Sequence, residues 1–160
     1  MEQTEQYVNM MLDSLKKKDE LLELIIGINK EQTDIASESE FDMDKFAASV
    51  ETKQKYIDEL NRLDSGFQAL YDNIKEPLIN EKTRYTVEIR MMQEYIKLLS
   101  EKSILIQVQE EKNRLSIQAH FAKMKKEVKV AKQSMKAASD YYKSMSKTAY
   151  VDSQFMDKKK

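Results

Sequence analysis

Few side chains of this 160-residue sequence could take part in catalysis, and they do not form a catalytic pattern. The chain has no cysteine, which excludes disulfides, a thiolate nucleophile and the usual ligands of structural zinc. Its single histidine, His120, lacks the glutamate three residues earlier that helical di-iron sites use, because position 117 is Ile. We therefore expect His120 to be a packed or partly exposed side chain and not a metal ligand.

The acidic residues and the glycines predict no site either. Asp19 and Glu20, like Glu110 and Glu111, are adjacent in sequence, so the two side chains of each pair point about 100° apart on a helix. Two glycines are too few to build a loop that cradles phosphate groups. The sequence therefore predicts no enzyme activity, no cofactor, no metal ion and no small-molecule substrate, which leaves binding by helical surfaces.

The composition is typical of an all-α protein. With two glycines and one proline, the chain lacks the residues that punctuate strands and tight turns. Its 41% hydrophobic and 34% charged residues fit a solvated helical bundle or coiled coil. No apolar segment reaches the ~20 residues of a membrane span, and no secretory signal is visible at the start. We therefore expect a cytoplasmic protein without membrane insertion.

Apolar residues at steps of three and four predict long helices. The first helix covers about residues 4–36, and the second covers about 42–73, with Asp42 as its N-terminal cap. The short acidic loop between them makes these two helices antiparallel neighbours.

The only proline, Pro77, predicts either that the second helix ends near Asn73 and the chain turns within residues 74–80, or that the helix continues with a kink; of the two, we expect the turn. A final helical run then covers about 80–146, without glycine or proline, and an unbroken helix over it would be about 100 Å long. Its apolar stripe weakens between Gln107 and Ser116. The run is therefore either one helix or two helices that are broken within this polar segment.

These elements predict one elongated antiparallel helical bundle or coiled coil, in which an N-terminal helical hairpin packs on a long C-terminal helix. The domain covers residues 1–146, and residues 147–160 form a flexible tail. Because the hairpin is about half as long as the final run, we expect it to cover the apolar stripe through Ile106 only. The remaining half is basic and contains several methionines, so it is left to contact a partner.

The charge distribution allows two interpretations. Residues 1–111 contain 14 Lys/Arg and 24 Asp/Glu, whereas residues 112–160 contain 13 Lys/Arg and 4 Asp/Glu. We expect the basic last third to pack against the acidic part as an antiparallel partner. The other interpretation is a binding site for nucleic acid or an anionic membrane, formed by Lys123, Lys125, Lys126, Lys129, Lys132 and Lys136.

Four segments of the chain also carry a family pattern. The leucine-rich first helix ends in Lys30-Glu31-Gln32 and is followed by an acidic loop. The segment from Asp42 continues with Phe46, Lys53, Ile57, Leu60 and Leu63. The stretch Glu111-Lys112-Asn113-Arg114-Leu115 and the closing Phe155-Met156-Asp157-Lys158 complete the pattern. Together these segments resemble the FlgN family of flagellar type III export chaperones.

The resemblance implies a chaperone that binds the C-terminal helices of hook-associated proteins of the FlgK and FlgL type. It also implies that the chaperone prevents their early assembly and helps deliver them to the export apparatus. In that family the substrate-binding part lies toward the C-terminal helix. Carried over to this chain, the partner-binding residues are Asn113, Leu115, Ile117, Phe121, Met124, Val128, Met135 and Tyr142.

A structural coiled coil is the alternative function. In this interpretation the chain forms a homodimer, and the uncovered half of the apolar stripe pairs with the same half of a second copy.

Overall fold

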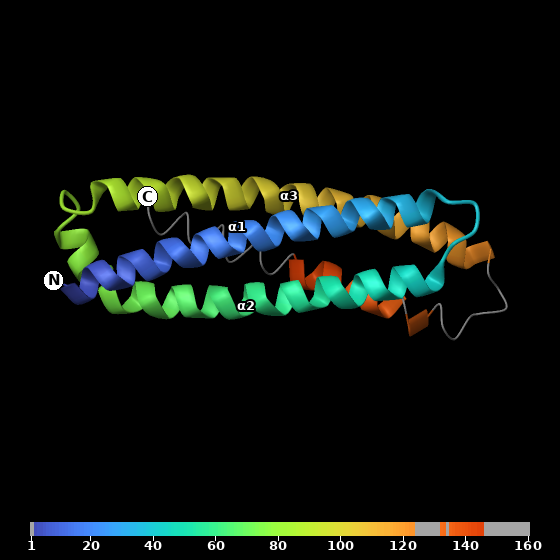
Figure 1. Ribbon diagram of the computed structural model, residues 1–160, viewed down its shortest axis with the longest axis horizontal. Coiled ribbons are helices and arrows are strands. Elements are labelled where there is room, and N and C mark those ends of the chain that lie inside the picture. The colour runs from blue at the N-terminus through green and yellow to red at the C-terminus, as the bar shows by residue number, and fades with distance from the viewer. Residues whose placement is uncertain (1, 124–131, 134, 146–160) are drawn as a thin grey trace.

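Three long helices lie side by side in an elongated bundle (Figure 1). The computed structural model describes residues 2–123, 132–133 and 135–145, and the long helices are α1 (Glu2–Ser37), α2 (Met43–Asn80) and α3 (Thr86–Lys123). Residues 135–145 form a further, shorter helical segment. The predicted all-α helical bundle is therefore confirmed.

Both ends of α1 and the beginning of α2 lie within two residues of the predicted positions. Asp42 caps α2 as expected, because its Oδ1 accepts a hydrogen bond from the backbone N–H of Lys45 at 3.1 Å. α1 packs against both α2 and α3, so it is the helix that joins the bundle together.

The predicted end of the second helix near Asn73 is wrong. α2 continues through Pro77 to Asn80, and the turn to α3 is at residues 81–85. Proline removes one backbone hydrogen bond from a helix. Here Ile74 and Leu78, on either side of it, are buried in the core, and this burial offsets the lost bond.

The polar segment Gln107–Ser116 does not break the final helix. It lies inside α3, where the two polar residues that weaken the apolar stripe, Glu110 and Asn113, are buried and hydrogen-bonded to the neighbouring helices. A helix does not need to break where its buried polar groups find partners.

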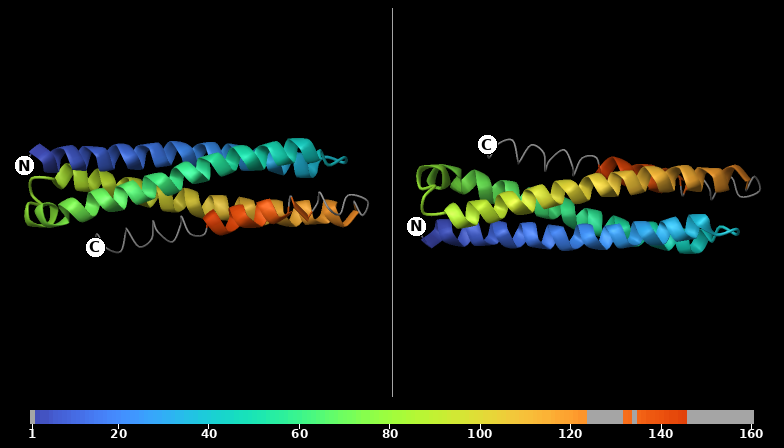
Figure 2. Two further views of the ribbon diagram at one scale, coloured as in Figure 1. Left: turned by 90° about the horizontal axis from the view of Figure 1, so that it is seen from below. Right: turned by 90° about the horizontal axis from the view of Figure 1, so that it is seen from above.

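A single helix over 80–146 is also wrong, because the chain reverses its direction beyond Lys123. Ala138 packs against the apolar cluster that contains Ile117, and Tyr141 lies over Lys53 at the level of Glu110, nearer to the start of α3. Residues 135–145 therefore run back along the bundle (Figure 2).

The reversal changes what covers the C-terminal part of the apolar stripe. Tyr141 and Met145 are fully buried members of the main core, which extends through the bundle. Ile117 and Phe121 belong to a second, smaller cluster beside the α1–α2 loop, with Ile35, Ala36 and Phe46. The half of the stripe that was expected to be uncovered is thus partly filled by the chain itself.

Candidate functional site

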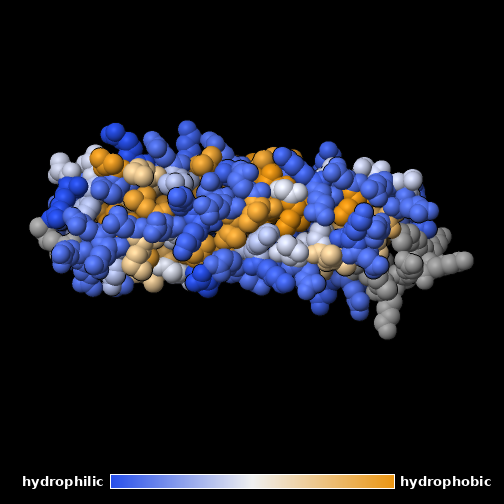
Figure 3. Space-filling model, in the orientation of Figure 1, coloured by the Kyte–Doolittle hydropathy of each residue, from blue (hydrophilic) through white to orange (hydrophobic). Residues whose placement is uncertain are grey.

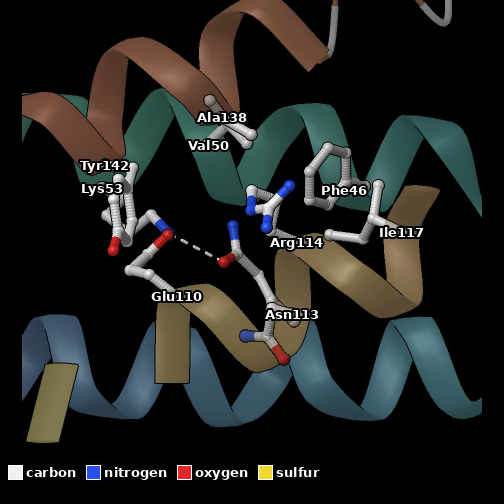
Figure 4. A pocket seen from close by; sticks show the side chains of 10 residues that line it. Phe46, Val50, Lys53, Glu110, Asn113, Arg114, Ile117, Ala138 and Tyr142 are labelled. Carbon is white, nitrogen blue, oxygen red and sulfur yellow. Dashed lines mark hydrogen bonds and ion pairs between the residues drawn. The ribbon is translucent and has the colours of Figure 1, made fainter. Parts of the chain in front are cut away.

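The predicted partner-binding residues do not share one surface. Asn113, Ile117 and Phe121 are buried, Tyr142 is half-buried, and Leu115 and Met135 are exposed. Met124 and Val128 lie outside the described residues. Asn113, Ile117 and Tyr142 do come together, around a small cavity between α2, α3 and the returning segment 135–145 (Figure 4).

A buried polar cluster lies next to that cavity, centred on Lys53 of α2. Its Nζ donates hydrogen bonds to Gln32 Oε1 at 2.8 Å, to Asn29 Oδ1 at 2.9 Å and to Glu110 Oε1 at 2.5 Å. Because an ammonium group has three N–H donors, all of them are used. The same Nζ lies 3.6 Å from the centre of the Tyr141 ring, which adds a cation–π contact.

The cluster extends to α3 through Asn113. Its amide nitrogen donates to the backbone carbonyl of Asn29 at 2.9 Å, and its Oδ1 accepts from the Thr33 hydroxyl at 2.7 Å. Gln32 continues the network in the other direction, donating to Ser49 Oγ at 3.0 Å. One polar layer therefore ties α1 to α2 and α3 at one level.

Burial shifts the pKa values of the titratable groups in this layer. It lowers the pKa of Lys53 to about 8, although the neighbouring Glu110 carboxylate acts in the opposite direction. Burial raises the pKa of Glu110, and Lys53 opposes that shift. Burial, together with the nearby charge of Glu110, also raises the pKa of Tyr141.

The polar layer has no room for a substrate. The cavity beside it has a volume of about 10 Å³, which is close to the space of one water molecule. Its polar groups are held by one another, so the arrangement fixes how the helices align and does not form an open reaction centre.

His120 has a comparable structural role nearer to the C-terminal end of α3. Its Nε2 donates to the carbonyl oxygen of Ala36 at 2.5 Å, since a carbonyl can only accept, and its ring stacks on Phe41 with centroids 5.1 Å apart. The half-buried histidine thus holds the last residues of α1 and the following loop. Among the described residues, no group of three or more metal-binding side chains lies together.

An apolar surface lies on the side of α3 that faces away from the core. We call it the outer stripe, and it consists of six side chains that are between 38% and 66% exposed: Val87, Met91, Leu98, Leu105, Val108 and Leu115. Their spacing of three, four and seven residues places them on one helix face over about 42 Å. α3 forms one long edge of the bundle (Figure 1).

The outer stripe is distinct from the isolated exposed apolar residues that any protein has. Met91 and Leu98, with Glu94 and Tyr95 beside them, line a surface groove of about 260 Å³. Apolar side chains reach the surface along the length of the bundle in Figure 3, between stretches of charged ones. A long exposed apolar surface of this kind is typical of interaction sites.

Charged residues occupy the heptad positions that the apolar residues of the outer stripe leave open. Glu94 and Glu101 share a heptad position with Val87, Val108 and Leu115, and Lys112 shares the position of Met91, Leu98 and Leu105. The outer stripe is therefore apolar at both ends and carries fixed charges between its apolar residues.

The sequence contained a signal for both features. Lys53 falls four residues before Ile57 and seven after Phe46, at core spacing, while Glu110 and Asn113 interrupt the core spacing of α3 at the same level. α3 has two sets of regularly spaced apolar residues, one on the buried face and one that forms the outer stripe. The second set is missed when apolar periodicity is assigned to a single face of the helix.

Comparison of the sequence with protein-family models, with curated proteins and with solved structures gives no match. Within the described part of the chain, no helix combines the length and the apolar character that crossing a membrane requires.

Proposed function

We propose that this protein is a cytoplasmic export chaperone that binds an amphipathic helix of a partner protein along the outer stripe of α3. It acts by covering the apolar stripe of the partner helix, which keeps that helix from pairing early with its own assembly partners. The proposal involves no bond-making step, so the protein is a binding protein and not an enzyme.

The outer stripe is the observation that carries this proposal. A helix with apolar residues at heptad spacing packs side by side with another helix of the same spacing, each side chain fitting between those opposite. The outer stripe offers about four heptads of such a surface to solvent. Most of the remaining apolar residues of α3 are buried in the bundle.

The resemblance to the FlgN family supplies the class of partner. It implies the C-terminal helices of FlgK- and FlgL-type hook-associated proteins as substrates and the type III export apparatus as their destination. The proposed site lies nearer to the start of α3 than the family pattern implies. Leu115 is common to both, whereas Ile117 and Phe121 belong to a buried cluster and are not proposed as contacts.

Isothermal titration calorimetry of the full chain with the C-terminal helical segment of a hook-associated protein tests the proposal. We expect micromolar or tighter binding, and a loss of about ten-fold for Val108→Lys, because a charge then lies in the apolar contact. The matched control is Ile79→Lys, since Ile79 is similarly exposed but lies on α2.

Two results would contradict the proposal. One is the absence of heat at micromolar concentration from a chain whose circular dichroism shows a folded helical protein. The other is an equal loss of affinity from Val108→Lys and Ile79→Lys, which would show that the partner helix does not bind at the outer stripe.

A further inference from the structure

The outer stripe of α3 is complementary to itself when a second copy lies against it in the opposite direction. In an antiparallel helix pair, each residue of one heptad position faces a residue of the other position, and the two numbers add to a constant. Placing Met91 opposite Leu115 of a second copy also places Leu98 opposite its Val108. Both of these apolar layers occur twice, because the arrangement has two-fold symmetry.

The charges of the outer stripe match in the same register. Glu94 then faces Lys112 of the second copy, and this pair of opposite charges occurs twice. Ile104, which is 61% exposed, meets its own counterpart near the two-fold axis. The two central layers each pair Leu105 with Glu101, and a charged position of this kind weakens a helix pair while fixing its register. Val87, at the end of the outer stripe, faces Ala119.

A parallel pairing of the same surface brings like charges together. In register, it places Glu94 against Glu94, Glu101 against Glu101 and Lys112 against Lys112. Like charges at facing positions are destabilising. Lys102 lies at the edge of the stripe toward α1, where Asp19 and Glu23 of the same chain hold it at 2.6 and 3.0 Å, so its charge is already matched in either arrangement.

From this complementarity we infer that two copies of this chain form a homodimer through antiparallel packing of their α3 helices along the outer stripe. The occupant of the surface is thus a second copy of the chain, in the register that places Met91 opposite Leu115. The inference does not rest on the proposed chaperone function, since the dimer requires no other protein.

Cysteine cross-linking tests the register directly, because the natural chain has no cysteine. Full-length Met91→Cys and Leu115→Cys chains are oxidised separately and as an equimolar mixture, and the fraction of disulfide-linked dimer is measured. Only facing positions bring two Cβ atoms within the ~4 Å that a disulfide needs. We expect the mixture to give at least about ten times more linked dimer than either variant alone.

Sedimentation equilibrium of the unmodified chain provides the second measurement, and Ile79→Cys on α2 provides the background for random cross-linking. We expect a mass of two 18.8-kDa chains. Val108→Lys should weaken the dimer about ten-fold, and Ile79→Lys should not change it. The inference is overturned if the chain sediments as a monomer up to about 100 μM. It is also overturned if Met91→Cys alone links as fully as the mixture, because that result indicates a parallel pair.

Discussion

Lys53 is a charged residue buried in the core, so its contribution to the free energy of unfolding should depend on pH. In the folded chain burial lowers its pKa to about 8, below the ordinary value of 10.5 that applies to the unfolded chain. Between these values the unfolded chain binds more protons than the folded chain. The contribution of Lys53 to the free energy of unfolding therefore rises as the pH rises through this window, and it is constant below about pH 8.

Replacing Lys53 with Met should remove this contribution and leave Glu110 buried without its cation. We expect Lys53→Met to lower the free energy of unfolding by about 3–5 kcal/mol near neutral pH. The deficit should grow between about pH 8 and 10.5, because the wild type gains stability there. Urea unfolding at several pH values measures it, and the exposed Lys55→Met is the control, expected within about 0.5 kcal/mol of wild type.

The double variant Lys53→Met/Glu110→Met distinguishes a coupled pair from two separate losses. With both charges gone, no unpaired ion is buried, so the double variant should lose clearly less than the sum of the two single variants. Some loss should persist, since Asn29 and Gln32 each lose the donor of a hydrogen bond. Additive losses would show that Lys53 and Glu110 do not depend on one another.

Gly27 allows a prediction of the opposite sign. It lies on the exposed face of α1, and no heavy atom lies within 4 Å of the position that an added Cβ would take. Neither a close helix contact nor a special backbone conformation requires the glycine. Gly27→Ala should therefore raise the free energy of unfolding by up to about 1 kcal/mol, as measured by urea unfolding. A lower stability would mean that another part of the protein lies close to Gly27 in solution and leaves no room for the added methyl group.

Single residues differ in how well their surroundings could be predicted. The cap at Asp42 was predictable, because an N-cap depends on residues within one turn of the helix. The half-buried state of His120 also followed from its place beside the apolar stripe. Its bond to Ala36 could not be predicted, since it joins residues 84 positions apart. The same holds for Lys53, whose three acceptors come from two other helices.

At the level of the helices, local spacing identified the type of the elements and where the first two begin, but neither where α2 ends nor how the final run divides. α1 and α2 begin within two residues of the predicted positions, because caps and apolar periodicity are local signals. The predicted end of α2 near Asn73 is wrong because Pro77 does not stop this helix. A helix-breaking residue acts only to the extent that packing does not oppose it, and the buried Ile74 and Leu78 oppose it here.

Removal of the proline from α2 should therefore increase the stability of the protein. Pro77 has no backbone N–H, so the carbonyl of Asn73 lacks its normal helical partner at that position. Pro77→Ala restores the donor and should raise the free energy of unfolding by about 1–3 kcal/mol, with no change in helix content by circular dichroism. A loss of stability would instead indicate that Pro77 favours the turn at residues 81–85.

The reversal of the chain beyond Lys123 was the least predictable feature of the fold. The final run has helical periodicity on both sides of it, without glycine or proline to mark a turn. What decides the arrangement is long-range burial: Tyr141 and Met145 are fully buried in a core built mainly by α1, α2 and α3. Periodicity reports that a segment has an apolar face, but not which surface of the same chain will cover it.

At the scale of the whole molecule, the bundle uses two apolar faces of α3 in different ways. The inner face is covered by α1, by α2 and by residues 135–145, and the outer stripe is the face available to other chains. The proposed chaperone function and the inferred dimer both use this outer stripe. A partner helix and a second copy therefore cannot occupy it at the same time, and their binding is linked through mass action.

This linkage makes a prediction that neither proposal makes alone. Adding the helical segment of the partner should convert the dimer into a complex of one chain with one segment, so the sedimenting mass should fall although a ligand is being bound. The apparent dissociation constant for the segment should also rise with protein concentration, because a larger fraction of the chains is then paired. A helix that binds elsewhere on the bundle would instead increase the mass of the dimer and leave the two equilibria independent. Val108→Lys provides the internal check: because it weakens both contacts, it should reduce segment binding and dimer formation together, whereas Ile79→Lys should change neither.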